Sequence, residues 1–235
     1  ALLVFGVLIL IDLVGVDRRY VNQDNFVDAR KVDKPDQATI ADKTINKDKG
    51  FYRVLDFSVN PFNSGRASYF HSAFGGYHGA KPKRAEDIFE FYVSRNKIGV
   101  VNMLNIKYII QENKGNIVAL NNPYANGNAW FVENIKTVST ADEEILALDS
   151  LNLKKQAVVL KNQASLKPNY VVDSLSTINL KSQKLNHLIY ESNNVNDGVA
   201  VFSEMYYKNG WNAYLDGNLV PHFKTNYLLR GLEVP

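Results

Sequence analysis

The sequence predicts an α+β protein, in which a mixed α/β domain with few helices is followed by an antiparallel domain of the β-sandwich or jelly-roll kind. Two observations lead to this fold class. In the first two-thirds of the chain, short stretches with helical spacing of apolar residues are mixed with short strand patterns. From Tyr170 onward nearly every segment alternates apolar and polar residues, and turn signals recur at a spacing of roughly 8–12 residues.

The C-terminal block Val199–Pro235 has the clearest strand pattern. In it Trp211, Ala213 and Leu215 fall on one face of an extended segment, with polar residues between them. Asp216-Gly217 supplies the positive φ that a two-residue hairpin turn requires. A further turn at Lys208-Asn209-Gly210 follows the strand Val199–Tyr207, so we expect three consecutive antiparallel strands.

Composition and charge restrict the function classes. With 27 basic and 24 acidic residues among 235, the formal net charge of +3 is close to neutral, so no nucleic-acid partner is expected. The chain has no cysteine, which excludes thiolate catalysis, cysteine-ligated zinc and any disulfide framework. The length suits two domains that each bury a core without covalent cross-links.

The N-terminal run Ala1–Ile11 has no polar side chain and stops at Asp12. It is shorter than the roughly 20 apolar residues that span a bilayer, and it lacks the basic start of a signal peptide. A short buried strand or helix is one interpretation, and the end of a membrane helix is the other. The charged connector with aromatic residues that follows favours the second. We therefore expect residues 1–38 to be the end of a membrane helix and a connector.

The mixed α/β domain is expected at 39–162 and the β-sandwich-like domain at 163–235, with Ser165 and Pro168 near the boundary. The first half of the mixed α/β domain is expected to contain a short helix capped by Gly50, a strand at Phe51–Val59, a loop at Asn60–Arg66 and a helix at Ala85–Arg95. Next we expect a short helix or turn and a strand within Val100–Gln111, with Ile117–Leu120 as the hairpin partner of that strand. The domain then ends with a strand at Ala129–Val138, a helix at Ala141–Leu148 that starts with a capping box, and a strand at Gln156–Leu160. In the β-sandwich-like domain, strands are expected at Tyr170–Leu175, Thr177–Lys181 and His187–Glu191 before the final block. Because the alternating pattern of a strand continues up to Pro235, we expect this domain to need one more strand.

The densest group of polar and aromatic residues lies between Ser68 and Arg84. Its two histidines are seven residues apart with no carboxylate between them, so neither a metal site nor a cofactor is expected. The Gly75-Gly76 pair, followed by basic residues and a helix, could hold a phosphate, although the spacing is not that of a Walker loop and an ordinary turn is the alternative. The candidate substrate-binding residues are His71, Tyr77, His78, Lys81, Lys83 and Arg84.

Several blocks, in a fixed order, carry a resemblance to a known family. They are SYFHSAFGGYHGAKPKR (68–84), LNIKYII (104–110), NPYANGNAWFVENIKTVSTADEEI (122–145), and SEMYYKNGWNAYLDG (203–217) with TNYLLRGLEVP (225–235). Together they resemble the extracytoplasmic C-terminal region of bacterial YfhO-type membrane proteins, over most of Arg18–Pro235. The specificity lies in the order of the blocks rather than in any single motif.

Such proteins resemble the GT-C superfamily of polytopic glycosyltransferases, which use polyprenyl-phosphate-linked sugars at the outer face of the membrane. The resemblance implies a place at the extracytoplasmic (periplasmic) face of the cell membrane, with the transmembrane part of the same protein and a lipid-linked sugar or glycan as partners. It also implies that Ala1–Ile11 ends a membrane helix and that a strand and a membrane helix follow Pro235. The acidic catalytic residue of that superfamily usually sits in an early loop without a counterpart here, so no catalytic residue is expected.

The residues leave three functions open. The first is an accessory domain for cell-envelope glycosylation that positions a lipid-phosphate sugar donor or a glycan acceptor through the 68–84 stretch. The second is a carbohydrate-binding module in which aromatic side chains of the C-terminal sheet stack on sugar rings, with Tyr207, Trp211 and Tyr214 as candidates, although a core tryptophan is the alternative for Trp211. The third is a purely structural or protein-docking domain, with Asp216 and Arg230 as ordinary turn and surface residues.

Overall fold

A computed structural model describes all 235 residues and confirms the α+β class. The chain forms two units, Ala1–Gln37 and Ala38–Pro235. The helices are α1 (Leu2–Tyr20), α2 (Ala29–Asp33), α3 (Ile40–Ile45), α4 (Arg66–Phe70), α5 (Lys83–Phe91), α6 (Ile98–Met103) and α7 (Ala141–Ala147), with 3-10 turns η1 (Gln23–Asn25) and η2 (Val93–Arg95). The strands are β1 (Arg53–Asp56), β2 (Ile106–Asn113), β3 (Asn116–Asn121), β4 (Ala129–Val132), β5 (Asn134–Val138), β6 (Gln156–Leu160), β7 (Thr177–Lys184), β8 (His187–Asn193), β9 (Gly198–Met205), β10 (Ala213–Leu215), β11 (Asn218–Val220), β12 (Phe223–Thr225) and β13 (Leu229–Val234).

The first unit contains α1, η1 and α2, and none of its residues is buried. Helix α1 begins at Leu2, directly after its N-cap Ala1, includes the rest of the apolar run to Ile11 and continues past Asp12 to Tyr20, with Arg18 and Arg19 in its last turn. The large apolar side chains of α1 are all exposed. None of the helices combines the length and the apolar character that crossing a membrane requires.

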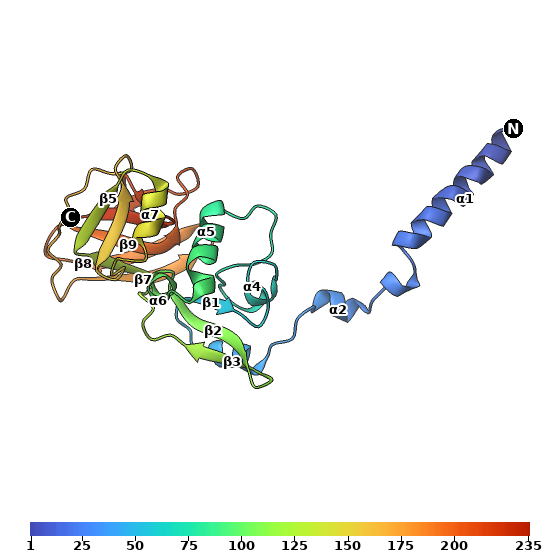
Figure 1. The fold of residues 1–235 in the computed structure, drawn as a ribbon, viewed down its shortest axis with the longest axis horizontal. Helices are drawn as coiled ribbons and strands as arrows, with labels where there is room; N and C mark the ends of the chain where they lie inside the picture. Colours follow the sequence, from blue (N-terminus) through green and yellow to red (C-terminus); the bar gives the residue numbers. More distant parts are fainter. The chain divides into compact units, whose positions relative to one another are not determined.

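A three-stranded sheet opens the second unit, in the order β1-β2-β3. Strand β1 runs parallel to β2, and β2 forms a hairpin with β3. Helix α3 covers this sheet because its apolar side chains Ala41 and Ile45 pack with Val54 and Ile110 in a small separate core. Figure 1 shows β1, β2 and β3 together, with α4 beside β1.

A four-stranded antiparallel sheet of order β12-β13-β9-β4 is the centre of the second unit. Successive residues of β9 point to opposite faces, as strand geometry requires, so Val199 and Val201 join the main core while Ala200 joins a second core. The second core also receives Ala213 and Leu215 of β10. The hairpins β7–β8 and β10–β11 are separate two-stranded sheets, and side chains of both pack into this second core.

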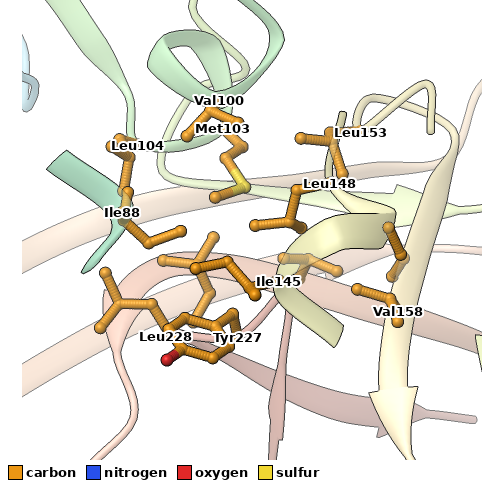
Figure 2. Close-up of a cluster of buried hydrophobic side chains, with 14 of the residues drawn as sticks. Ile88, Val100, Met103, Leu104, Ile145, Leu148, Leu153, Val158, Tyr227 and Leu228 are labelled. Atoms are coloured by element: carbon orange, nitrogen blue, oxygen red, sulfur yellow. The ribbon is translucent and has the colours of Figure 1, made fainter. Parts of the chain in front are cut away.

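The main core joins segments that are far apart in the sequence. Figure 2 shows Ile88 of α5, Met103 of α6 and Ile145 of α7 packed near Tyr227 and Leu228, which lie between β12 and β13. The parallel strands β5 and β6, linked by α7, add further apolar side chains to the same core. The boundary expected at 162/163 therefore falls within one compact unit, in which β4 also pairs with β9.

Local signals predict several elements correctly. The hairpin β2–β3 turns at Lys114-Gly115, and β10–β11 turns at Asp216-Gly217, with positive φ at all four residues. The capping box that starts α7 is present, because Thr140 and Glu143 exchange side-chain to backbone hydrogen bonds. The helix before Gly50 is also confirmed, but it ends at Ile45, so Gly50 does not cap it.

Three strand predictions are wrong. The expected strand Ala129–Val138 is broken at Glu133, whose backbone bonds to Lys155 and Tyr170, so β4 and β5 lie in different sheets. The expected strand Tyr170–Leu175 is irregular. The three-strand meander is absent, since β10 pairs with β11 alone while β9 pairs with β13 and β4. None of Lys208–Gly210 has the positive φ of a tight hairpin, and the chain leaves the sheet there.

Candidate functional site

The structure places His71 in a buried ion cluster, made of Asp42, Asp56, Arg66 and His71. Arg66 is paired with both carboxylates, at 2.7 Å from Asp56, and His71 Nε2 lies 3.0 Å from Asp42 Oδ1. Both carboxylate side chains are fully buried. Burial raises the pKa of Asp42, but hydrogen bonds from Thr39, His71 and Arg66 outweigh it and hold that pKa below its usual range. The cluster ties α3, β1 and α4 together.

The two lysines and the arginine at the end of the 68–84 stretch also have partners within the protein. Lys83 lies 3.3 Å from Glu86 and 3.1 Å from Asp87. Lys81 donates to the side chain of Asn63 at 3.2 Å. Arg84 pairs with the fully buried Glu144 at 3.1 Å, donates to the Tyr227 carbonyl at 2.8 Å and stacks 4.1 Å from the Tyr227 ring centroid.

Tyr77 and His78 are exposed, directly after the two glycines. Gly75 and Gly76 have φ of 122° and 120°, and Gly76 donates its N–H to the Pro61 carbonyl at 2.7 Å. A Cβ on Gly75 would lie 2.3 Å from that carbonyl oxygen, so the close approach of the two segments requires glycine. The six candidates are thus divided between a buried cluster, contacts with nearby side chains and open surface, and none of them lines the cavity formed by the C-terminal hairpins.

That cavity lies in a different region of the second unit. It has a volume of about 600 Å³ and lies among the β7–β8 hairpin, the β10–β11 hairpin and the sheet strands β9 and β13. We call it the hairpin cavity. Its lining includes the aromatic side chains Tyr190, Trp211 and Tyr214, and the polar side chains Glu204, His222 and Arg230. Cavities of this size that combine aromatic walls with a few convergent polar groups are typical of small-molecule sites.

Arg230 of β13 is the one lysine or arginine among the lining residues. Its guanidinium stacks on Trp211, with its central carbon 4.3 Å from the ring centroid, and its Nε donates to the Met205 carbonyl at 3.1 Å. No carboxylate lies within 4.0 Å of the Arg230 guanidinium, and Arg230 takes part in none of the ion pairs of the protein. Its two terminal nitrogens make no hydrogen bond within the protein, and the charge of Glu204 acts on the guanidinium from a longer distance.

Two further polar atoms beside the hairpin cavity are buried without a hydrogen-bond partner in the protein, the Tyr190 hydroxyl oxygen and His222 Nε2. Burial raises the pKa of Tyr190, so its hydroxyl stays protonated. Burial, together with the charge of Arg230, lowers the pKa of His222, which favours its neutral ring. Unpaired buried polar groups are uncommon in folded proteins and call for an explanation such as a bound molecule.

Of the three weaker candidates, the structure brings Trp211 and Tyr214 to the hairpin cavity. Trp211 is half-buried, and Tyr214 is exposed over 61% of its surface. Tyr207 is equally exposed, and its ring lies against Gly210, which belongs to the lining. Trp130, by contrast, is buried in the main core and donates its indole N–H to the Leu153 carbonyl at 3.1 Å.

The geometry offers binding groups rather than an evident reacting pair. The one side-chain hydrogen bond made by a histidine joins His71 to Asp42. No group of three or more His, Asp or Glu side chains is placed to hold a metal ion. The chemistry that the hairpin cavity supplies is an aromatic face beside a guanidinium, with a phenol and an imidazole next to it.

Arg230, His222 and Tyr190 are not predicted as site residues from the sequence, in which Arg230 is expected at the surface. A signal is present for Arg230, which interrupts the apolar run Leu228–Leu232 in a strand that is half-buried by its pattern. No comparable signal marks the other two residues, because only the fold brings β8 and the segment before β12 to one cavity.

No protein-family model matches the chain, and no curated protein or solved structure is significantly similar to it.

Proposed function

We propose that Ala38–Pro235 is a binding unit that takes a glycan in the hairpin cavity and does not itself catalyse a reaction. The observation that carries the proposal is the lining of the cavity, which combines the aromatic side chains of Trp211 and Tyr214 with Tyr190 and His222, each of which has a buried polar atom without a protein partner. Sugar rings present an apolar face of C–H groups to aromatic side chains and a rim of hydroxyls to hydrogen-bonding groups. The hairpin cavity offers partners for both parts of such a ring.

The geometry favours the hairpin cavity over the 68–84 stretch as the main binding site. In that stretch Lys83 and Arg84 already have carboxylate partners, and His71 is held by Asp42. A phosphate would have to compete with these contacts. In the hairpin cavity, Arg230 has no carboxylate partner to give up.

An array of bacterial cell-envelope oligosaccharides, probed with the labelled 235-residue chain, tests the proposal. We expect the wild-type chain to bind a subset of the glycans and Trp211→Ala to lose that binding, because the aromatic wall is removed. Tyr77→Ala is the matched control, since it deletes a 75% exposed aromatic side chain from the 68–84 stretch. Binding to none of the glycans at millimolar concentration would overturn the proposal. Loss of binding in Tyr77→Ala, with Trp211→Ala unaffected, would move the site to the 68–84 stretch.

The family resemblance adds a membrane context, and we propose that α1 associates with lipid. The support is that its large apolar side chains are exposed all along the helix, whereas a helix that docks on a protein buries one apolar face. A binding unit at the outer face of the membrane could position donor or acceptor glycans for a glycosyltransferase of the cell envelope. In a liposome flotation assay the whole chain should rise with the vesicles, and a chain lacking residues 1–37 should stay below. Equal behaviour of the two chains would contradict this role of α1.

A further inference from the structure

We infer that the glycan bound in the hairpin cavity carries a singly charged oxyanion, which pairs with Arg230. The inference rests on the proposed function and adds the chemical class of the ligand. Its basis is a half-buried cation with no carboxylate within 4.0 Å, on which the charge of Glu204 acts only from a longer distance. A guanidinium removed from water is costly unless its charge and its N–H groups are satisfied.

The contacts of Arg230 leave part of its guanidinium open. Nε is occupied by the Met205 carbonyl, and one face of the group is covered by the Trp211 ring. The two terminal nitrogens have no protein acceptor, and the side chain lines the cavity. The terminal nitrogens of a guanidinium form a planar fork that suits the two oxygens of an oxyanion.

The other charged groups of the lining do not take this place. Glu204 is paired with Arg53 at 3.3 Å, and Asp216 is exposed at the tip of the β10–β11 hairpin. No lysine lines the cavity, and His222 favours its neutral form. Arg230 is therefore the one cation left to balance a charge on the ligand, and it balances a single negative charge. A uronic-acid carboxylate or a phosphodiester carries one negative charge, whereas a phosphate monoester carries roughly 1.5 to 2 negative charges near neutral pH.

Three matched oligosaccharides test the inference. The first contains glucuronic acid, the second is its carboxyl-reduced glucose counterpart, and the third links the same glucose through a phosphodiester. Calorimetry with the 235-residue chain measures the three dissociation constants. We expect at least one acidic probe to bind about tenfold more tightly than the neutral one, because a hydrogen bond to a charged group is stronger than one to a hydroxyl. Preference for the carboxylate or for the phosphodiester then identifies the source of the charge.

Two variants connect the preference to the residue. Arg230→Gln should bind the acidic and the neutral probes equally, and Arg230→Lys, which keeps the charge but loses the fork, should retain part of the preference. The urea midpoint of each variant shows whether it folds. Equal affinity of the wild type for acidic and neutral probes would overturn the inference and leave the proposed function standing. A charge preference that survives in a folded Arg230→Gln would overturn it as well. No binding of any probe or array glycan would overturn the inference together with the proposed function.

Discussion

At the scale of single residues, the buried ion cluster of Asp42, Asp56, Arg66 and His71 connects segments that are separate in the sequence. One guanidinium satisfies two carboxylates whose side chains have no exposure to water. Removing one partner of a buried pair leaves an uncompensated charge inside the protein. His71, which the sequence analysis proposes as a ligand contact, is therefore held in a structural network of ion pairs.

The first prediction concerns Arg66. Arg66→Met should lower the free energy of unfolding by about 3 kcal/mol, because it leaves two buried carboxylates without their cation. Urea denaturation of the whole chain measures the change. Lys155→Ala is the control, since it breaks an exposed pair with Glu133 at 3.0 Å and should leave the midpoint nearly unchanged. Similar midpoints for wild type and Arg66→Met would contradict the role of the cluster.

The second prediction concerns acid. Because the pKa of Asp42 is lower in the folded state than in the unfolded chain, the stability that its ionised form contributes is present above the ordinary pKa of about 4. It is lost as pH falls through the lowered folded value. The difference in stability between wild type and Asp42→Asn should therefore shrink as pH falls below about 5. A difference that grows on acidification would have the opposite sign and refute the assignment.

Glu144 acts in the opposite direction to Asp42. Burial raises the pKa of Glu144 despite the charges of Lys224 and Arg84, so protonation of Glu144 stabilises the fold as pH falls through that raised value. The overall pH profile of the wild type combines both groups. Comparison with Asp42→Asn isolates the cluster, because Glu144 is common to both proteins.

At the scale of elements, the two hairpins β2–β3 and β10–β11 form a matched pair. Both turn through a residue with positive φ followed by glycine, at Lys114-Gly115 and Asp216-Gly217. At both glycines an added Cβ would meet no atom within 4 Å, so a substitution acts through backbone strain alone. Of these two hairpins, β10–β11 lines the hairpin cavity and β2–β3 does not.

The third prediction follows from that pair. Gly217→Ala and Gly115→Ala should each cost about 1 kcal/mol in unfolding free energy, because alanine is strained at positive φ. Gly217→Ala should also weaken glycan binding several-fold, since the strained turn shifts the strand that carries Tyr214. Gly115→Ala should bind as the wild type does. If both variants bind equally well at matched stability, the β10–β11 hairpin does not shape the site.

Elements are predictable from sequence wherever a local signal determines them. The capping box of α7 and the two residue-glycine turns act over four residues or fewer, and the structure has them. Strand pairing is not local, which is why the predicted meander is wrong. Asn226 illustrates the difference, because its side chain accepts from the Val158 N–H at 2.9 Å, and the sequence does not show that these two segments meet.

At the scale of the whole molecule, the candidate site arises from the same non-local pairing. Strand β13 lies between β12 and β9, and β4, which is separated from β9 in the chain by strands β5 to β8, also joins the sheet. Apolar side chains pack on both faces of this sheet, and the hairpin cavity lies on the face of the second core. Aromatic content in the sequence predicts Trp211 and Tyr214 as ligand contacts. The sequence marks Arg230 only as an interruption of an apolar run, and the position of β13 inside the sheet is what assigns it to the cavity.

The fourth prediction concerns the two units. Every buried residue of the three cores lies in Ala38–Pro235, and Ala1–Gln37 has none. Removal of residues 1–37 should therefore leave the urea midpoint and its slope almost unchanged, because neither core burial nor a long-range ion pair is lost. A clear fall in the midpoint would mean that the N-terminal unit contributes to the stability of the compact unit.

The two tryptophans allow a direct measurement of the central claim that the hairpin cavity binds a glycan. Trp211 lies at the cavity and stacks on Arg230, whereas Trp130 is 5% exposed and its indole N–H is bonded to Leu153. In a ¹H–¹⁵N spectrum of the whole chain, titration with the oligosaccharide that binds best on the array should shift the indole signal of Trp211 in a saturable way and leave that of Trp130 in place. A Trp211 signal that stays fixed up to millimolar oligosaccharide, or a shift in Trp130 alone, would contradict the claim.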